Sequence, residues 1–248
     1  MKNEKNNAII AGEVCSVPTK YDCCGENFYA FSLSVKRTSG VADILTVNIS
    51  QNLLGKIAVG DKVAFEGQVR TYNRIIDDKS RLIIVFFALN KIEYEKDVNQ
   101  VELHGYLCKT PVFRTTPRNR EICDALVAVN RERGYSDYIP CIVWGRTARL
   151  VGDLSTGAEI RLSGRLQSRE YEKRTPNGIE KRTAYEVSVN RICDPNKRGY
   201  RLYFLSRRTE RVKGLSLIGL RQSVFIGRFR VRRYSDEKRN LRSIRSGV

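Results

Sequence analysis

The stretch "IAGEVCSVP" (residues 10–18) returns further along the chain as "LHGYLCKTP" (residues 103–111). A glycine, a cysteine and a proline recur at matching places, so that Gly12 corresponds to Gly105. Self-similarity of this kind indicates a duplicated structural unit, and it decides how the rest of the chain is divided.

Three further pairs of segments follow in the same order. "FSLSVKR" (31–37) matches "ALVAVNR" (125–131), "DILTVNIS" (43–50) matches "DYIPCIVW" (137–144), and "GDKVAFEGQVR" (60–70) matches "GAEIRLSGRLQ" (157–167). The offset between matching residues changes only from 93 to 97 over these segments, and it is 100 where "LNKI" (89–92) matches "VNRI" (189–192). The sequence therefore predicts two similar domains, residues 1–97 and 98–198, followed by an extension, residues 199–248.

Each unit offers about five short strand candidates separated by Gly, Asp, Asn and Pro, with a break before the fourth that could hold a helix. Strands and a helix in this order are the elements of an OB-fold, a small Greek-key barrel. A pair of β-sandwiches fits less well, because each unit has too few strands. We therefore predict an all-β chain of two tandem OB-fold barrels, the first one degenerate, plus a basic C-terminal extension.

Charge is spread unevenly over these segments. The chain carries 45 Lys and Arg against 27 Asp and Glu, a net charge of +18, which favours a polyanionic partner. Residues 1–97 hold 13 basic and 12 acidic side chains, residues 98–198 hold 18 and 12, and residues 199–248 hold 14 and 3. We expect the second unit and the extension to bind the anion.

The fourth strand candidate of the second unit alternates clearly. Arg161, Arg165, Arg169 and Tyr171 share one face, and the opposite face is mostly apolar. Guanidinium groups can follow the phosphates of a single strand while a ring stacks on a base. Loops rich in Pro, Asn and Gly are expected at residues 113–121 and 170–182, beside this face.

The segment that ends at Trp144, the only Trp of the chain, is apolar on both sides. Tyr138 and Trp144 lie on one side, and Ile139, Cys141 and Val143 lie on the other. Aromatic rings commonly fill cores as well as binding surfaces, so the pattern alone leaves both interpretations open.

Three segments of the second unit resemble the bacterial single-stranded DNA-binding proteins: "VELHGYLCKTPVFRTTP" (101–117), "LVAVNRERGYSDYIPCIVWGRTARL" (126–150) and "GRLQSREY" (164–171). The duplication resembles the tandem OB-fold variants of clostridial type. The resemblance covers residues 101–193 and is weak over the first unit. It implies sequence-independent binding and protection of single-stranded DNA in replication, repair or recombination. Because members of the family assemble four OB barrels, it also implies a homo-oligomer, a dimer of this chain.

The resemblance places the DNA-stacking aromatics of the family at Tyr138, Trp144 and Tyr171. The matching residues of the first unit are Ile44, Ser50 and Arg74, none of them aromatic. The complete predicted nucleic-acid-binding set is Tyr138, Trp144, Tyr171, Arg146, Arg149, Arg161, Arg165, Arg169, Tyr106 and Arg131.

The end of the chain departs from the family. Its members usually carry a short acidic tip that recruits replication and repair proteins, whereas this chain ends in the basic "EKRNLRSIRSGV" (237–248). Replication and repair proteins stay candidate partners, but recruitment through the usual acidic tip is not expected. Residues 199–248 lack a sustained period and cap signals, and we expect them to be disordered or loosely packed.

Other functional classes find little support. The chain has no phosphate-binding loop, no zinc-protease motif and no C-x-x-C pair, and its only His is His104, so we predict neither an enzyme nor a cofactor or metal site. Seven Cys in apolar runs are expected to be small buried side chains. Without a signal peptide or a membrane span, we expect a bacterial cytoplasmic, nucleoid-associated protein. The alternative is an OB-fold interaction module that binds RNA or a protein partner.

Overall fold

The computed structural model describes residues 5–23, 26–76, 78–131, 134–175 and 178–193. The predicted extension, residues 199–248, lies outside the described residues. Both repeats belong to one structural unit, residues 1–201.

The first repeat forms a closed five-stranded barrel with one additional edge strand. Its elements are β1 (Asn6–Val14), β2 (Thr19–Cys23), β3 (Glu26–Lys36), β4 (Ala42–Ser50), α1 (Gln51–Leu54), β5 (Lys62–Ile76) and β6 (Lys79–Lys91). β1 pairs with both β3 and β5, which closes the ring β1-β3-β4-β6-β5. The β4–β6 pair is parallel, and the other pairs are antiparallel.

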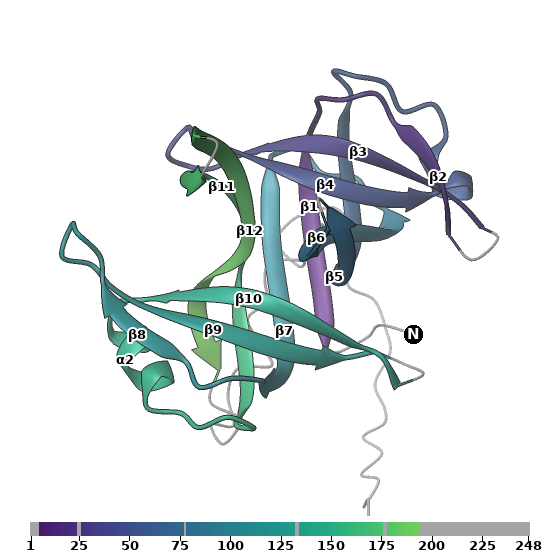
Figure 1. The fold of residues 1–248 in the computed structure, drawn as a ribbon. Coiled ribbons are helices and arrows are strands. Elements are labelled where there is room, and N and C mark those ends of the chain that lie inside the picture. Colours follow the sequence, from purple (N-terminus) through teal and green to yellow (C-terminus); the bar gives the residue numbers. More distant parts are fainter. Residues whose placement is uncertain (1–4, 24–25, 77, 132–133, 176–177, 194–248) are drawn as a thin grey trace, which may run out of the picture. The chain divides into compact units, whose positions relative to one another are not determined.

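The second repeat has the same order of elements. They are β7 (Val98–Leu107), β8 (Val112–Thr115), β9 (Glu121–Asn130), β10 (Ser136–Trp144), α2 (Arg146–Gly152), β11 (Glu159–Thr175) and β12 (Gly178–Cys193). Its ring is β7-β9-β10-β12-β11, as Figure 1 shows in blue to green. The prediction of two tandem OB-fold barrels is confirmed. The additional strands β2 and β8 pair only with β3 and β9, outside the rings.

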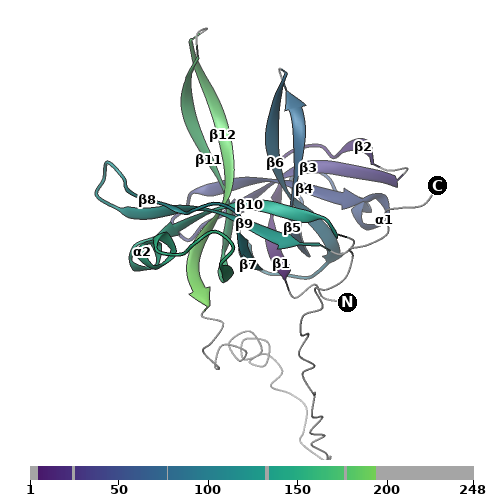
Figure 2. The same ribbon diagram turned by 60° about the horizontal axis from the view of Figure 1, so that its bottom comes forward.

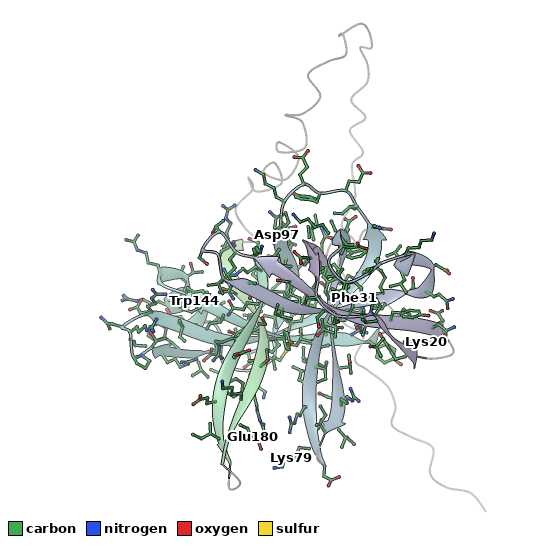
Figure 3. The ribbon with its side chains drawn as sticks, turned by 90° about the horizontal axis from the view of Figure 1, so that it is seen from above. Lys20, Phe31, Lys79, Asp97, Trp144 and Glu180 are labelled. Atoms are coloured by element: carbon green, nitrogen blue, oxygen red, sulfur yellow. The ribbon has the colours of Figure 1, made fainter. Side chains whose placement is uncertain are left out.

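Much of the chain expected to be loop at residues 170–182 is instead a long hairpin, so that prediction was wrong. β11 and β12 remain paired as far as Thr175 opposite Gly178, with Tyr171 opposite Arg182. The hydrogen bonds between the two strands satisfy the backbone groups of the hairpin without help from a core. The β5–β6 hairpin has the same form, and Figure 2 shows both hairpins extending beyond the barrels. In Figure 3 their far ends are marked by Lys79 and Glu180.

The glycines that revealed the repeat stand where two strands approach closely. A Cβ atom on Gly12 would lie 2.2 Å from the carbonyl oxygen of Ser34, and one on Gly105 would lie 2.2 Å from that of Ala128. At these points β1, already paired with β5, also begins to pair with β3, and β7, already paired with β11, begins to pair with β9. This second pairing closes each ring. A side chain there would open the barrel, which explains the repeated glycine.

The core consists of the residues that alternate into each ring. Phe65 and Phe86 are among the largest buried side chains of the first barrel, and Ile139 and Leu166 are among those of the second. Cys123 and Cys141 are buried as expected, but Cys15 is exposed, and there the prediction for the cysteines was wrong. Cys15 follows β1, where its thiol donates a hydrogen bond to the carbonyl oxygen of Ser32 instead of packing.

Antiparallel pairing of β1 with β7 joins the two barrels into one sheet. Asn6 lies opposite Leu103 and Ile10 lies opposite Asn99, a register that relates the repeats by an approximate twofold axis. The two Asn residues correspond in the repeat, and each side chain both donates to and accepts from one backbone position of its own barrel. The boundary at residue 97 separates the two repeats in the sequence, and its role as a domain boundary stays a prediction.

Two buried carboxylates fasten each barrel to the other. Asp137 accepts a hydrogen bond from Arg131 (2.6 Å) and another from the backbone N–H of Thr71 in the first repeat (2.6 Å). In the mirrored arrangement, Asp43 accepts from Arg37 (2.7 Å) and from the backbone N–H of Ser168 (3.1 Å). Because both carboxylates are fully buried, each depends on its Arg and on the opposite barrel for solvation.

Candidate nucleic-acid interface

The structure settles which side of β10 faces the barrel interior. Ile139, Cys141 and Val143 belong to the hydrophobic core, whereas Tyr138 and Trp144 lie outside it. Tyr138 is 48% exposed and Trp144 is 37% exposed, so neither ring is core filling. The two rings therefore lie on the outer face of the second barrel, at opposite ends of one strand.

Trp144 is held in place without being buried. Its indole Nε1 donates to the hydroxyl of Ser188 on β12 (3.1 Å), which satisfies the only polar group of the ring. The chain then turns at Gly145, whose φ of 61° lies in the left-handed region, and enters α2. The ring is thus fixed at the rim of the barrel with part of its surface accessible.

A hollow of ≈ 660 Å³ opens beside this ring. Besides Trp144, four guanidinium-bearing side chains line it: Arg37, Arg120, Arg165 and Arg169. The other lining residues are neutral, and no carboxylate is among them. Positive charge gathered around an aromatic surface is the arrangement that suits a phosphate attached to a planar group.

Arg165 is the most constrained of these cations. It donates to Gln167 Oε1 (3.1 Å), and its Nε lies 4.0 Å from Asp43 Oδ2. Within the part of the chain that the structure describes, this Nε is buried and makes no hydrogen bond. Burial, followed by the nearby charge of Arg37, lowers the pKa of Arg165, although Asp43 acts in the opposite direction. The negative charge of an incoming anion would offset both effects.

Arg169 and Tyr171 continue the surface along the β11 arm. The Arg169 guanidinium carbon lies 5.8 Å from the centroid of the Tyr171 ring, and its Nε lies 3.5 Å from Glu186 Oε1. Both residues are on the exposed face of the hairpin, with Tyr171 38% exposed. The structure therefore brings Trp144, Arg165, Arg169 and Tyr171 onto one continuous face.

Tyr138 has a second tyrosine beside it. Tyr106 on β7 and Tyr138 on β10 are both directly opposite Ala128 on β9, so all three side chains point to the same face. Two strand spacings put the tyrosine backbones about 10 Å apart. Tyr106 is 44% exposed, so two accessible rings lie on either side of the small Ala128 side chain.

The remaining predicted residues are not gathered at the hollow. Arg131 is held by Asp137 and also donates to the carbonyl oxygen of Thr71, so its contacts in the structure are structural. Arg149 donates to Glu121 (2.8 Å), which raises the pKa of Arg149. Arg146 is exposed at the start of α2, and Arg161, 3.8 Å from Glu159, lies near the beginning of β11. A role for these four in nucleic-acid binding stays a prediction.

Sequence reasoning missed most of the residues that line the hollow, among them Arg37, Arg120 and Ser188. Arg37 comes from the first repeat, Arg120 from the turn before β9, and Ser188 from β12. For Arg37 a signal existed, because it matches Arg131 in the aligned repeats. The sequence did not show that pairing of β1 with β7 places Arg37 of the first repeat beside the second barrel.

Among the residues that the structure describes, no group of three or more His, Cys, Asp or Glu side chains is placed to hold a metal ion. His104 Nε2 lies 2.5 Å from Glu159 Oε1. Within the same described segments, no helix is long and apolar enough to cross a membrane.

The second repeat is thus an OB-fold barrel with exposed aromatic rings and guanidinium groups on its outer face. The family model of the "Single-strand binding protein family" matches residues 98–193, the whole second repeat. "Single-stranded DNA-binding protein 1" of Clostridium acetobutylicum is 36% identical over 85 residues, covering 30% of this chain and 76% of that protein. The chain belongs to the single-strand binding protein family.

Two further comparisons extend this result. "Single-stranded DNA-binding protein 1" of Staphylococcus aureus is 38% identical over 105 residues, covering 39% of this chain and 58% of that protein. The chain thus matches little more than half the length of this relative. The crystal structure of the wild-type single-stranded DNA binding protein from Thermus aquaticus superposes with a TM-score of 0.61 at 20% identity, over 78% of this chain and 94% of that chain. This likeness spans both repeats and confirms the fold.

Proposed function

We propose that this protein binds single-stranded DNA without sequence preference and protects it during replication, repair or recombination. The observation that carries the proposal is the outward-facing Trp144, which shares one hollow with four arginines. The names of the relatives in Staphylococcus and Clostridium support it.

The physical chemistry of the surface matches a single strand better than a duplex. Unpaired bases expose their faces, and stacking on one ring contributes about 1–3 kcal/mol per base whatever the base is. Paired bases are already stacked on each other and offer only groove edges and phosphates. Trp144, Tyr138, Tyr106 and Tyr171 supply the rings, while Arg37, Arg120, Arg165 and Arg169 supply the charge.

The proposed action is passive and involves no chemical reaction. Binding alone keeps a single strand from pairing and from attack. We further propose that the chain works as a homodimer, which would bring four barrels together, and that it does so in the bacterial cytoplasm, where single strands are exposed during replication. Sedimentation at micromolar concentration tests the assembly, and a monomer would contradict it.

A competition experiment tests the choice of ligand. A fluorescently labelled dT oligonucleotide is bound to the full chain and displaced with unlabelled single-stranded DNA, RNA or duplex DNA of equal length. We expect single-stranded DNA to displace the probe at the lowest concentration. Equal displacement by duplex would contradict the proposal, and stronger displacement by RNA would favour an RNA-binding module. Fragmentation of the probe in the presence of Mg²⁺ or Ca²⁺ would show that the action is not passive.

A further inference from the structure

The outer face of the first barrel carries an aromatic cluster of its own. The Tyr21 and Phe28 rings are stacked with centroids 6.0 Å apart, and the Phe28 and Phe87 rings are tilted with centroids 5.6 Å apart. The guanidinium carbon of Arg70 lies 3.6 Å from the Phe87 centroid. Three rings and one cation thus form a row across β2, β3, β6 and β5.

These rings are not part of the barrel core. Phe31 on β3 and Phe86 on β6 belong to the core, whereas Phe28 and Phe87, at positions of the opposite parity, lie outside it and are only partly buried. The fold does not need aromatic side chains there. In the second repeat the places of Phe28 and Phe87 are taken by Ile122 and Ser188.

The exposed aromatic residues of the two repeats lie on different strands of the barrel. In the second barrel, Trp144 on β10 lies between β9 and β12. In the first barrel the same place holds Ser50, and the rings stand on the two neighbouring strands, Phe28 on β3 and Phe87 on β6. A flat apolar surface is therefore present on both barrels, built from different residues.

Cations accompany this cluster as they accompany Trp144. Arg70 donates to Gln68 Oε1 (3.1 Å), and Arg131 of the second repeat donates to the carbonyl oxygen of Thr71, the residue after Arg70. Burial and the nearby charge of Arg131 lower the pKa of Arg70. Arg131 thus lies close to Arg70 beside this cluster, as Arg37 lies close to Arg165 beside Trp144.

We propose that Tyr21, Phe28, Phe87 and Arg70 form a second binding site, which takes unpaired bases of single-stranded DNA on the first barrel. The proposal extends the proposed function and depends on it. Exposed Tyr72 continues the same face along β5 toward the hairpin. The guanidinium group of Arg70 lies over the Phe87 ring, and the carboxylate whose charge acts on it, Asp137, is already paired with Arg131. A cation beside the rings favours an anionic strand over an apolar protein surface, because an apolar partner would bury the charge of Arg70 without a phosphate to pair with it.

A tryptophan moved between the barrels tests this directly. Since Trp144 is the only Trp, the double variant Phe28→Trp, Trp144→Phe carries one reporter, in the first barrel. We expect poly-dT to quench its emission, with saturation at the DNA concentration that saturates the anisotropy of a labelled oligonucleotide. The control is Tyr94→Trp, Trp144→Phe, whose reporter lies in the exposed segment after β6, away from the cluster. Its emission should change much less.

The outcomes separate the two proposals. Unchanged emission from Trp at position 28 while anisotropy shows saturated binding would overturn the second site and leave the proposed function intact. No binding by the wild-type chain would overturn both. Emission that shifts with protein concentration in the absence of DNA would show that a second copy of the chain covers this face, which also overturns the proposal.

An affinity measurement provides a second, independent readout. Phe28→Leu keeps an apolar side chain but removes the ring, so loss of one stacked base should weaken binding of a long dT oligonucleotide about fivefold or more. An affinity equal to that of the wild type, with an unchanged unfolding midpoint, would contradict the second site.

Discussion

The two repeats share their framework and differ on their outer faces. Both keep the glycine at the strand crossing, the Asn that bonds its own barrel, and the Arg–Asp pair that holds the other barrel. On the outer face, by contrast, Trp144 corresponds to Ser50 and Tyr138 corresponds to Ile44. The residues on which ring closure and barrel contact depend are therefore shared by the two repeats, whereas the residues that we propose to contact DNA differ.

The difference extends to the charge of the two barrels. The first repeat is close to neutral, while the second carries a clear excess of basic side chains. Nevertheless each barrel contributes one Arg to the surface of the other. Arg37 of the first repeat lines the hollow beside Trp144, and Arg131 of the second repeat donates to the carbonyl oxygen of Thr71 in the first. The proposed binding surface is therefore formed by both barrels together and not by the second barrel alone.

Breaking the shared framework should have the largest effect. Asp137→Ala removes a fully buried carboxylate and leaves Arg131 and the Thr71 N–H without their partner. We expect a loss of about 3–5 kcal/mol in the free energy of unfolding, measured by urea denaturation. Asp43→Ala should cost a similar amount, because its environment is the mirrored one.

The control for this experiment is an exposed carboxylate. Asp153→Ala, at the end of α2, should change the free energy of unfolding by no more than about 0.5 kcal/mol. A loss at Asp137 as small as that at Asp153 would show that the Arg–Asp pairs do not hold the barrels together.

Removing the indole should have the next largest effect, on binding instead of folding. Trp144→Ala should weaken the binding of dT oligonucleotides by about 1–3 kcal/mol, measured by anisotropy. Trp144→Phe keeps a ring and should lose less. The control is Ile44→Ala, since Ile44 in the first repeat matches Tyr138 in the second. Because Ile44 is not aromatic, this variant should bind like the wild type. Full affinity of Trp144→Ala would remove the main support for the interface.

The smallest effect is expected for a single charge of the hollow. Arg169→Gln should reduce the slope of log K against log salt by about 0.7, the value for one phosphate contact with a single strand. Lys56→Gln, an equal change of charge at an exposed residue of the first repeat, should leave the slope unchanged. Equal slopes for the two variants would mean that Arg169 acts only through the overall charge.

Most of the fold could be predicted because its signals are local. Turn residues, strand alternation and the matched glycines define the two barrels and the helix after the third ring strand of each. The β11–β12 arm was missed because it leaves the barrel, so that beyond Leu166 neither of its faces needs to be apolar. Without a buried face, a paired strand has the polar composition of a loop.

The site could be predicted only in part. Alternation placed Arg165, Arg169 and Tyr171 together, and the structure agrees. The orientation of Trp144 could not be derived, since both sides of β10 are apolar and only the closed ring defines an inside. The contribution of Arg37 depends on pairing between strands that are distant in sequence, which no local pattern encodes.

The central claim is that the outer face of the second barrel takes up a single strand, and Trp144 itself reports on it. Its fluorescence in the wild-type chain is titrated with poly-dT at two salt concentrations. The account predicts quenching that saturates, with weaker binding at the higher salt because arginine–phosphate contacts release counterions. Emission that stays constant while a labelled oligonucleotide is bound to saturation would contradict it, because the only indole would then lie outside the interface.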